Sequence, residues 1–560
     1  MSKMKPEKSR IKSDILLRVR LLYILFILAG LLIFARLVWV QLFSSEVAYN
    51  AERLAGRIFT EQIIPAQRGN ILTRDGDPLA TSIFRYRVEF DFGSPGLDSV
   101  RTFHEQSDSL SKLLAAYFGD RSAAEYRRMF RTQHAKHYQV KYRKDTLVPR
   151  SEGRIARWID RILDREFVPK KLYDTLRDHT PVQIFPRDID YTEWETLRKY
   201  PLLNWNMGMV YNLRESDERI YPQGELGRRT IGLTGDRGNY GIEAVYREEL
   251  AGRDGRATRQ RIARGFYGRV VDGDNIDPID GLDVVTTLDL DVQDVANRYL
   301  REQLEAQNAI WGTTIVMEVR TGEILALVNL GRTPGGGYAE RENYAIGRNT
   351  EPGSTFKLVQ GLIGLQEGVL RPSDLHSCHM GYQAGRLKMA CHAHASPLDL
   401  RFAVATSCNA YFCYVFRDIL DNPKYGSVKE GYDVWKQYVE SFGFGRKLGS
   451  DFLDEGNGYV PDRAYYDRQY RGSWNSLTVL SLSIGQDALG CTPLQLANLA
   501  CIVANRGYYY IPHIVKKIEG QDSLDARFYE RHYTMVEPKH FEPIVEGMWR
   551  GVNVGGTSTR

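Results

Sequence analysis

More than any other feature, one long apolar run near the N-terminus constrains the fold of this chain of 560 residues. The run covers residues 21–43 and contains a single charged side chain, Arg36, toward its outer end. Its length matches the roughly 20 apolar residues that a helix needs to cross a bilayer. A charge at that end can reach the membrane interface. We therefore expect an uncleaved transmembrane helix over 21–43, with a cleaved signal peptide as the alternative.

The charges before this run predict its orientation. Residues 1–20 carry the basic side chains Lys3, Lys5, Lys8, Arg10, Lys12, Arg18 and Arg20, against the acidic Glu7 and Asp14. Basic flanks remain on the cytoplasmic side of a membrane. We therefore expect a cytoplasmic tail over 1–20 and the large remainder of the chain outside the cytoplasm. Because no second apolar run of similar length follows, the sequence predicts a single-pass protein.

The composition narrows the class of protein further. A hydrophobic content of 43% and a charged content of 26% are those of a folded protein, and the length suggests roughly three domains. The net charge of +5 is small for this length and no nucleic-acid motif is present, so we expect no nucleic-acid partner. The six cysteines all lie between residues 378 and 501 and are too few for a disulfide scaffold.

The segment after the apolar run is polar, rich in Tyr and Arg, and interrupted by turns. We expect a β-rich module over 44–305, with helices within 106–200. Asp75-Gly76 predicts a hairpin turn, and residues 86–91 alternate as a half-buried strand does. The glycine-rich stretch 228–255 predicts turns. A phosphate-binding loop is the alternative there, although the glycine spacing fits neither nucleotide-binding pattern.

From about residue 306 the pattern becomes that of an α/β domain. Strands are predicted over 313–319 and 323–328, and a helix capped by Asp289 or Asp291 precedes them. The apolar face of that helix is expected to comprise Val292, Val295, Ala296, Tyr299, Leu300 and Leu304. The chain as a whole is thus expected to be α+β and multidomain, with an α/β domain over 306–560.

Ser354 and Lys357 stand three residues apart, after Pro352-Gly353 and at the start of an apolar run. On a helix that begins at Ser354 these side chains share one face, so the amine can act as the base that activates the hydroxyl. Gly368 is expected to end this helix. The same spacing occurs at Ser2/Lys5, Ser9/Lys12 and Ser109/Lys112. A chance match is therefore the alternative, but none of those pairs follows Pro-Gly or opens an apolar helix.

A second element that such a site needs lies 53 residues after Ser354. In Ser407-Cys408-Asn409, the hydroxyl can relay a proton, and the amide can bind both the lysine and a peptide carbonyl. We expect this element on a helix that begins near Ala403 and runs through Phe416. A further helix is expected from Thr492, with proline in its first turn. Ser473-Trp474-Asn475 has the same spacing but lies among glycine and polar residues, which is typical of a loop.

The sequence from Pro352 to Lys357, followed by Ser-x-Asn, resembles the transpeptidase domain of penicillin-binding proteins, whose catalytic set serine β-lactamases share. Further matches, in the order found in class B members, are Arg68-Gly69 with Arg74-Asp75-Gly76, Gly241-Ile242-Glu243, Thr286-Thr287-Leu288-Asp289, Thr321-Gly322-Glu323-Ile324-Leu325-Ala326, and Ile484-Gly485-Gln486 with Thr492-Pro493-Leu494-Gln495. The resemblance implies an elongated pedestal of the dimerisation type over 44–305 and a penicillin-binding, serine β-lactamase-like domain over 306–560.

This resemblance implies a peptidoglycan D,D-transpeptidase in the bacterial inner membrane, with its bulk in the periplasm. It implies Ser354 as nucleophile, Lys357 as base, Ser407 as proton relay and Asn409 as the residue that positions the peptide. The implied substrates are stem peptides ending in D-Ala-D-Ala, β-lactams are the implied inhibitors, and no cofactor is required. The implied partners are a SEDS-family glycosyltransferase and the cell-wall elongation or division machinery. A non-catalytic activator of such a glycosyltransferase is the alternative function.

Two departures from the family pattern affect these expectations. The Lys-Thr-Gly or Lys-Ser-Gly motif is absent, and Gly556-Thr557-Ser558 lacks the lysine. We therefore expect a C-terminally truncated, incomplete domain that lacks one oxyanion-hole donor and is nearly inactive; a naturally inactive protein is the alternative. Gly485-Gln486-Asp487 replaces the commoner Gly-Gln-Gly. The chain up to Lys357 resembles the division-specific type, and the part from Cys378 onward resembles the elongation-specific type. Of the two, we prefer the elongation-specific type for the whole protein.

A group of cysteines and histidines follows the serine by about two dozen residues. Cys378, Cys391, His392 and His394 can supply thiolate and imidazole ligands for tetrahedral zinc. Outside the cytoplasm, a Cys378–Cys391 disulfide is an alternative, and unpaired cysteines are another. The resemblance to the elongation type favours zinc. Cys408 and Cys413 are expected to be small apolar core residues.

Overall fold

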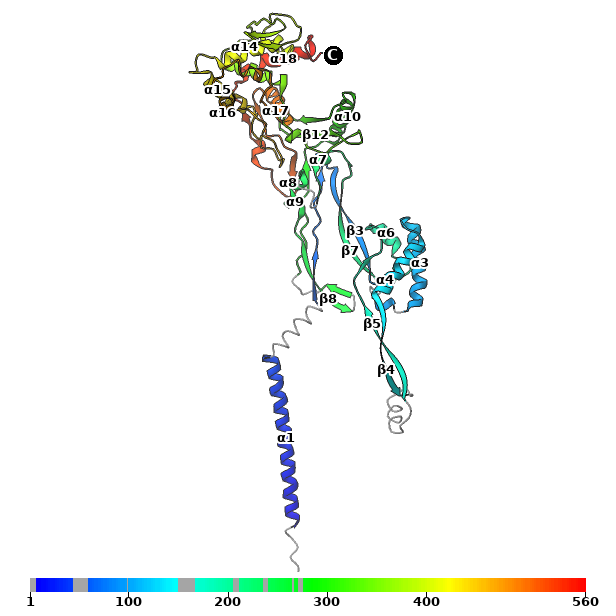
Figure 1. The fold of residues 1–560 in the computed structure, drawn as a ribbon. Coiled ribbons are helices and arrows are strands. Elements are labelled where there is room, and N and C mark those ends of the chain that lie inside the picture. Colours follow the sequence, from blue (N-terminus) through cyan, green and yellow to red (C-terminus); the bar gives the residue numbers. More distant parts are fainter. Residues whose placement is uncertain are drawn as a thin grey trace, which may run out of the picture. The chain divides into compact units, whose positions relative to one another are not determined.

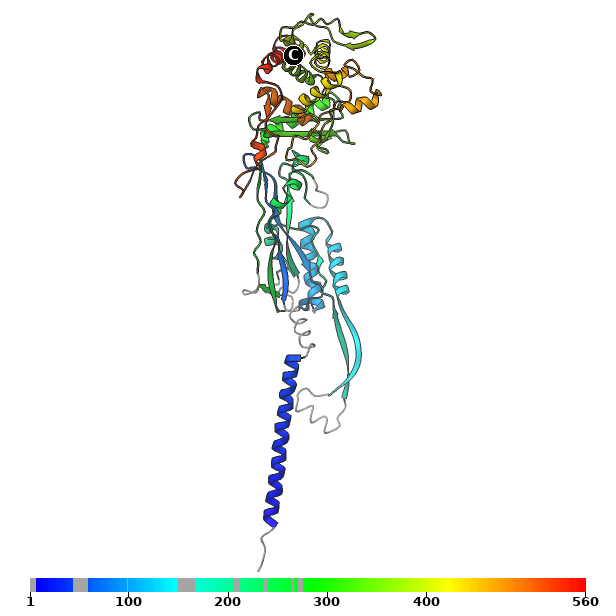
Figure 2. The ribbon, with the colours of Figure 1, turned by 90° about the vertical axis from the view of Figure 1, so that its left-hand side faces the viewer.

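The computed structural model describes residues 7–43, 59–97, 99–149, 167–204, 211–234, 240–263, 266–269 and 275–559. The chain forms two compact units. Unit 1 comprises Met1–Pro65, Phe84–Ser216 and Asp254–Pro278, and unit 2 comprises Ala66–Ile83, Asp217–Arg253 and Ile279–Arg560. Figure 1 and Figure 2 show their helices and strands from two directions.

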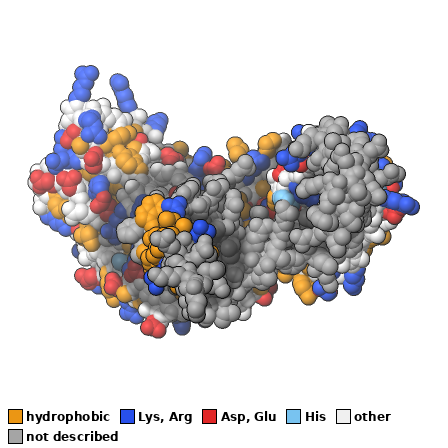
Figure 3. Space-filling model, turned by 90° about the horizontal axis from the view of Figure 1, so that it is seen from below, with side chains coloured by type: hydrophobic (Ala, Val, Ile, Leu, Met, Phe, Trp, Pro, Cys, Tyr) orange, Lys and Arg blue, Asp and Glu red, His pale blue; other side chains and the backbone are white. Residues whose placement is uncertain are grey.

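The N-terminal apolar run forms helix α1 (Glu7–Phe43). Within it, Leu16–Trp39 has a mean hydropathy of 2.6 over 24 residues and is long and apolar enough to cross a membrane. Its apolar side chains are exposed, and Figure 3 shows hydrophobic side chains gathered in a patch beside Lys and Arg. This is the one helix with these properties in the described part of the chain. Its length and composition fit the predicted membrane anchor.

Unit 1 combines a helical group with long hairpins. Its elements are β1 (Phe59–Ile64), η1 (Pro95–Leu97), α3 (Val100–Phe118), α4 (Ala123–His137), β4 (Tyr138–Pro149), β5 (Phe167–Arg177), β6 (Val182–Gln183), α6 (Tyr191–Leu197), β8 (Gly255–Ala263) and β9 (Phe266–Arg269). Ser99, Ser122 and Asp190 cap α3, α4 and α6 by accepting backbone N–H bonds. The helices share an aromatic core that includes Phe90 and Phe130.

The prediction that residues 106–200 are helical is wrong for 138–149 and 167–177. After α4 the chain turns into the antiparallel β4–β5 hairpin, whose register runs from Tyr138 opposite Arg177 to Pro149 opposite Phe167. Figure 1 shows this hairpin extending away from α3 and α4. The charged residues of this stretch fit either an exposed helix face or an exposed ribbon, so their pattern does not separate the two.

Two strands pass from one unit into the other. They are β3 (Pro78–Phe90) and β7 (Tyr211–Ile220). In unit 2, β3 pairs antiparallel with β2 (Ile71–Leu72), and Gly76 between them has a φ of +96°. This confirms the predicted Asp-Gly turn, because glycine adopts that conformation without steric cost. The predicted strand over 86–91 is confirmed as the end of β3.

The first part of unit 2 contains the predicted turns and the predicted hairpin. Its elements are α7 (Arg228–Ile231), α8 (Ile242–Val245), α9 (Arg247–Ala251), β10 (Val284–Thr286), α10 (Leu290–Ala306), β11 (Trp311–Met317), β12 (Ile324–Arg332), β13 (Tyr338–Ala339) and α11 (Tyr344–Gly347). The described part of 228–255 forms short helical turns, and a Cβ on Gly241 would lie 2.6 Å from the Thr230 carbonyl oxygen. That glycine allows close backbone packing.

Helix α10 packs on the sheet β11–β12–β13, in a small core with Leu304, Val328 and Tyr338. Asp289, one of the two predicted caps, accepts the Val292 N–H. The domain boundary predicted between residues 305 and 306 would therefore separate α10 from the sheet on which it packs. One residue of the apolar face predicted for α10, Tyr299, is 56% exposed and therefore not part of this core.

The remaining elements of unit 2 build the large helical core. They are η2 (Gly353–Phe356), α12 (Lys357–Gln366), β14 (Gly381–Ala384), β15 (Leu387–Ala390), α13 (Leu400–Ala405), α14 (Asn409–Leu420), α15 (Val428–Ser441), α16 (Arg463–Gln469), η3 (Leu480–Ile484), α17 (Pro493–Ala504), β16 (Tyr508–Tyr509), β17 (Val515–Ile518), η4 (Ala526–Tyr529), β18 (His532–Tyr533), η5 (Pro538–His540) and α18 (Phe541–Asn553). Phe356, Phe412 and Trp435 are fully buried at its centre. The α12 helix thus lies inside the core, and the turn η2 that precedes it carries the exposed Ser354.

A buried ion-pair network joins three segments of unit 2. The Glu243 carboxylate accepts from Arg68 Nη2 at 2.6 Å and from Arg219 Nε at 2.8 Å. The Glu243 side chain has no exposed surface, and that of Arg219 is 6% exposed. A buried carboxylate needs such partners because it has lost its contact with water. The Gly-Ile-Glu sequence at 241–243 therefore has a structural role, because its glutamate pairs with Arg68 and Arg219.

Candidate active site

Ser354 and Lys357 lie on one tight turn at the start of α12. Ser354 belongs to the 3₁₀ turn η2, and Lys357 is the first residue of the α-helix. The serine therefore lies one turn before the α-helix that was predicted to begin with it. Lys357 Nζ is 3.2 Å from Ser354 Oγ. Gly368, with a φ of +72°, follows the end of this helix, as predicted.

The lysine amine is surrounded by acceptors from a second segment. Its Nζ lies 2.9 Å from Ser407 Oγ, 2.7 Å from the Ser407 carbonyl oxygen and 2.5 Å from Asn409 Oδ1. The structure therefore brings together the four residues Ser354, Lys357, Ser407 and Asn409 around one amine. Ser354 is exposed, whereas Lys357 is only 2% exposed. A reactant can reach the hydroxyl while the amine stays shielded from water.

Burial changes the protonation of this amine. It lowers the pKa of Lys357 from its ordinary value of 10.5 to about 8, because a charged ammonium loses its hydration when it is buried. The neighbouring cysteines Cys391, Cys408 and Cys413 raise this pKa by a smaller amount. A substantial neutral fraction near pH 8 makes Lys357 a suitable general base.

The Ser407–Asn409 segment is a break between two helices. α13 ends at Ala405, Ser407 has a φ of +52°, and α14 begins at Asn409. The prediction of one continuous helix from Ala403 is therefore wrong. A positive φ is costly for a serine and interrupts the helical hydrogen bonds. The break turns the Ser407 carbonyl and hydroxyl toward Lys357, which a continuous helix would prevent.

Asn409 is held by the strand β15 and the residue after it. Its Nδ2 donates to the Ala390 carbonyl oxygen at 2.7 Å, and its backbone N–H donates to Cys391 Sγ at 3.3 Å. The side-chain amide thus faces Lys357 with its oxygen and β15 with its nitrogen. No sequence pattern identifies Ala390 as a partner, because it contributes only a backbone carbonyl.

A third segment supports the turn that carries Ser354. The Gly353 N–H donates to the Gly485 carbonyl oxygen at 2.9 Å, and a Cβ on Gly485 would lie 2.3 Å from the Gly353 carbonyl oxygen. Only glycine fits at this contact. Asp487, which stands where the family commonly has glycine, has a φ of +79°. The loop therefore keeps the backbone conformation that favours glycine, and Tyr466 donates to the aspartate at 3.3 Å.

The cysteine and histidine group lies beside this site, with a changed membership. Sγ of Cys378, Cys391 and Cys408 and a ring nitrogen of His394 all lie within 4.8 Å of one another. His392 does not belong to this group, and Cys408 replaces it. Cys408 is buried in the core, as expected, and the break before α14 also brings its thiol close to the other two. Cys413 is fully buried and contacts Ser483, as a core residue does.

The alternative disulfide is not formed. All six cysteines of the chain are unpaired in the structure. Three thiols and one imidazole are a donor set that proteins use for structural zinc. Cys391 Sγ lies 3.4 Å from His394 Nε2, and hydrogen bonds from Asn409 and His394 help lower the Cys391 pKa against the effect of burial.

Comparison with known proteins identifies both parts of the chain. The family model of the penicillin-binding protein transpeptidase domain matches residues 312–560, and that of the penicillin-binding protein dimerisation domain matches residues 63–286. The chain therefore belongs to the class B penicillin-binding proteins, of the elongation or division type.

A curated relative shows how far the sequence similarity extends. The peptidoglycan D,D-transpeptidase MrdA of Acinetobacter baumannii is 27% identical over 352 residues, which are 55% of this chain and 49% of the relative. The chain thus spans about half the length of the curated relatives it matches.

Two solved structures share the fold at lower identity. A chain of a peptidoglycan synthase complex that coordinates polymerization and crosslinking aligns over 96% of this chain and 85% of its own length, with a TM-score of 0.58 and 22% identity. PBP2 of Helicobacter pylori, solved in complex with MreC, aligns over 89% of this chain and 85% of its own length, with a TM-score of 0.59 and 17% identity.

Proposed function

We propose that this protein is a serine-type D,D-transpeptidase that cross-links peptidoglycan stem peptides through an acyl-enzyme at Ser354. The observation that carries the proposal is the position of Lys357, whose amine lies within 3.2 Å of Ser354 Oγ and also contacts Ser407 and Asn409. The transpeptidase family match over 312–560 and the D,D-transpeptidase relative support the same reaction.

The first half of the reaction forms the acyl-enzyme. Neutral Lys357 removes the proton from Ser354 Oγ, and the oxygen attacks the carbonyl carbon of the penultimate D-Ala. The C–N bond to the terminal D-Ala breaks, and the proton reaches the leaving amine through Ser407. Asn409 donates to the peptide and keeps Lys357 in position. In the second half an amine of a neighbouring stem attacks the ester, forms the cross-link and releases Ser354.

Covalent labelling with a fluorescent penicillin tests the nucleophile in the full-length membrane protein. We expect wild-type labelling at Ser354, confirmed by mass spectrometry of the labelled peptide, and no labelling of Ser354→Ala. Ser109→Ala is the matched control, because Ser109 has the same spacing to Lys112 but lies on the exposed face of α3. Undiminished labelling of Ser354→Ala would refute the assignment. Absence of labelling in the wild type would favour the non-catalytic activator.

We also propose that residues 1–560 by themselves react slowly. They contain no Lys-Thr-Gly or Lys-Ser-Gly sequence, whose strand supplies the second oxyanion-hole donor in the family. The loss of one such donor typically costs about 3–4 kcal/mol of transition-state stabilisation. Equal penicillin acylation rates for this polypeptide and for one that carries the motif would contradict the proposal.

The placement and partners of the protein follow from the same family. We propose that α1 anchors it in the bacterial inner membrane, with residues 1–20 in the cytoplasm and the remainder in the periplasm. The similar chain in a peptidoglycan synthase complex supports a SEDS-family glycosyltransferase as partner, and the PBP2–MreC complex supports an elongation role. Protease digestion of intact spheroplasts tests the orientation, because an external protease should remove unit 2 only if it is periplasmic.

Finally, we propose that Cys378, Cys391, Cys408 and His394 hold a structural zinc ion. The four ligand atoms are close enough to share one ion, and three cysteines with one histidine suit tetrahedral zinc. A bound ion would fix β15 to the turn at Ser407–Asn409. We expect one zinc per chain by atomic spectroscopy, lost in His394→Ala and kept in His392→Ala, the matched control. Absence of zinc together with a linked Cys378–Cys391 pair would overturn this.

A further inference from the structure

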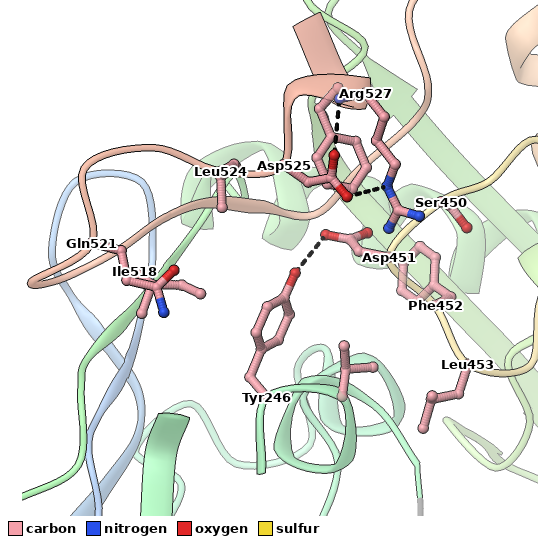
Figure 4. A pocket seen from close by; sticks show the side chains of 12 residues that line it. Tyr246, Ser450, Asp451, Phe452, Leu453, Ile518, Gln521, Leu524, Asp525 and Arg527 are labelled. Atoms are coloured by element: carbon pink, nitrogen blue, oxygen red, sulfur yellow. Dashed lines mark hydrogen bonds and ion pairs between the residues drawn. The ribbon is translucent and has the colours of Figure 1, made fainter. Parts of the chain in front are cut away.

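A second hollow in unit 2 shares no lining residue with the site around Ser354. Its volume is about 360 Å³, and its walls come from residues 245–246, 450–453 and the stretch from Ile518 to Phe528. Figure 4 shows these three segments facing one another across an open space. A volume of this size accommodates a small organic molecule. Nothing in the reaction proposed for Ser354 uses this space.

Asp451 is the group that gives the hollow its chemistry. The residue is 6% exposed, and its two oxygens accept the Ile514 N–H at 3.0 Å each. Oδ2 also accepts the Val515 N–H at 2.9 Å. The buried His513 is a basic neighbour of Asp451, and its charge favours the ionised carboxylate. Burial disfavours a charged group, and desolvation raises the pKa of Asp451 above its ordinary value, against the opposing effects of the Val515 and Ile514 N–H groups and of His513.

This carboxylate retains capacity for one more strong donor. An ionised carboxylate offers about four acceptor positions. Oδ1 is occupied only by its share of the Ile514 N–H, and the Tyr246 hydroxyl approaches Oδ2 at a long 3.5 Å. Figure 4 shows the carboxylate and the Tyr246 hydroxyl turned toward each other at the edge of the open space. A donor that enters the hollow can therefore reach the carboxylate.

The other walls select for an apolar body with a positive charge. Phe452, Leu524 and Ile518 are apolar, and Figure 4 shows Phe452 beside Asp451 and the other two across the open space from it. At the rim, Arg527 Nε is 3.4 Å from Asp525 Oδ2, so these two charges offset each other. Asp451 is then the acidic group of the lining that is not paired with the lining arginine.

We propose that this hollow binds a small organic amine, with its ammonium on Asp451 and its apolar body against Phe452 and Leu524. The ammonium would bring a permanent positive charge to the buried carboxylate, and the ligand would join the Tyr246 segment to the loop at 450–453. This site is independent of the function proposed for Ser354.

The test uses three probes of similar shape and different charge on the full-length protein in detergent. Phenethylammonium carries the cation, 2-phenylethanol is neutral, and 3-phenylpropionate is an anion. We expect saturable binding of phenethylammonium by calorimetry and saturation-transfer NMR, with at least tenfold weaker binding of the alcohol and of the anion. Equal affinity for the alcohol would overturn the assignment to Asp451, and absence of saturable binding by the amine would overturn the site itself.

Two variants locate the binding in this hollow. Asp451→Asn should weaken amine binding at least tenfold while the alcohol is unaffected. Because Asp451 also accepts backbone N–H groups, a destabilised loop is a risk in that variant. Leu524→Trp avoids it by filling the space and should abolish binding. Leu375→Trp, at an exposed position outside the hollow, should leave the affinity unchanged. Wild-type affinity in Leu524→Trp would refute the site.

Discussion

At the scale of single residues, the chemistry of this protein depends on how deeply one lysine is buried. Lys357 has four acceptor contacts but no carboxylate partner among them. A nearby carboxylate would stabilise the ammonium and raise its pKa. The surroundings instead offer hydroxyl, amide and carbonyl oxygens, which bind the neutral amine as well. The position therefore favours a base over a permanent cation.

This gives a pH dependence with a defined sign. Since burial lowers the Lys357 pKa to about 8, the neutral fraction reaches about one half at pH 8 and is nearly complete above about pH 9. The penicillin acylation rate should increase roughly tenfold between about pH 6 and 7, rise less steeply through about pH 8, and level off near about pH 9. Stopped-flow labelling measures it. Lys357→Arg should acylate poorly at every pH, and a wild-type rate that is flat from pH 6 to 9 would exclude Lys357 as the base.

A second single-residue effect concerns Asp487, which adopts a φ of +79° in the loop that supports Ser354. Glycine has no Cβ clash there, so Asp487→Gly should stabilise unit 2 by about 0.5–1 kcal/mol. The lost Tyr466 contact offsets little, because it is long at 3.3 Å. Urea unfolding measures the change. Asp522→Gly, at an exposed position without positive φ, should give no gain, and an equal gain there would contradict the explanation.

At the scale of elements, α17 shows how one residue can join a helix to a distant loop. Thr492 and Gln495 form a capping box, in which each side chain accepts the other's backbone N–H. Gln495 Nε2 also lies 2.8–3.0 Å from the carbonyl oxygens of Gly443, Arg446 and Asn457. The glutamine therefore closes the helix end and holds the 443–457 segment as well.

The two capping residues should consequently differ in their importance. Thr492→Ala removes a cap and should cost about 1 kcal/mol of unfolding free energy. Gln495→Ala leaves several buried backbone groups unsatisfied and should cost at least about 2 kcal/mol, since each such group costs about 1–3 kcal/mol. Denaturant unfolding of both variants decides this. Equal losses would mean that the loop contacts of Gln495 contribute little.

At the scale of the whole molecule, unit 2 is assembled from three separate stretches of chain. The first stretch supplies Arg68, and the second supplies Arg219 and Glu243. Their network lies beside the strand β3 that leads into unit 1. Such buried charges are stable only together, because each removes the desolvation cost of the others.

Glu243→Gln should therefore destabilise unit 2 by about 3 kcal/mol, since it leaves the buried Arg219 and the partly buried Arg68 without their carboxylate. Thermal unfolding measures the loss. Glu519→Gln is the matched control, because its ion pair with Lys517 is about half exposed and should contribute less than about 1 kcal/mol. A loss for Glu243→Gln no larger than that of the control would show that the network is not a stabilising junction.

Features that depend on neighbouring residues could be predicted from the sequence. The apolar run of α1, the Asp-Gly turn at Gly76, the Asp289 cap and the strand–turn–strand of β11 and β12 each follow from local pattern and turn chemistry. The Ser354–Lys357 spacing belongs to the same group, because any helical turn places residues i and i+3 together. Where a charged pattern suits two structures, as over 138–177, local reasoning does not choose between them.

The tertiary structure alone decided which distant groups meet. The break at Ser407, which accompanies the contact of its hydroxyl with Lys357 and brings Cys408 close to Cys391, is not indicated by the local sequence. The lowered pKa of Lys357 likewise depends on a core that buries it. The physical reason is common to both. Hydrogen-bonded turns involve near neighbours in the chain, whereas burial and ligand geometry depend on segments far apart in sequence, whose contacts exist only once the core has formed.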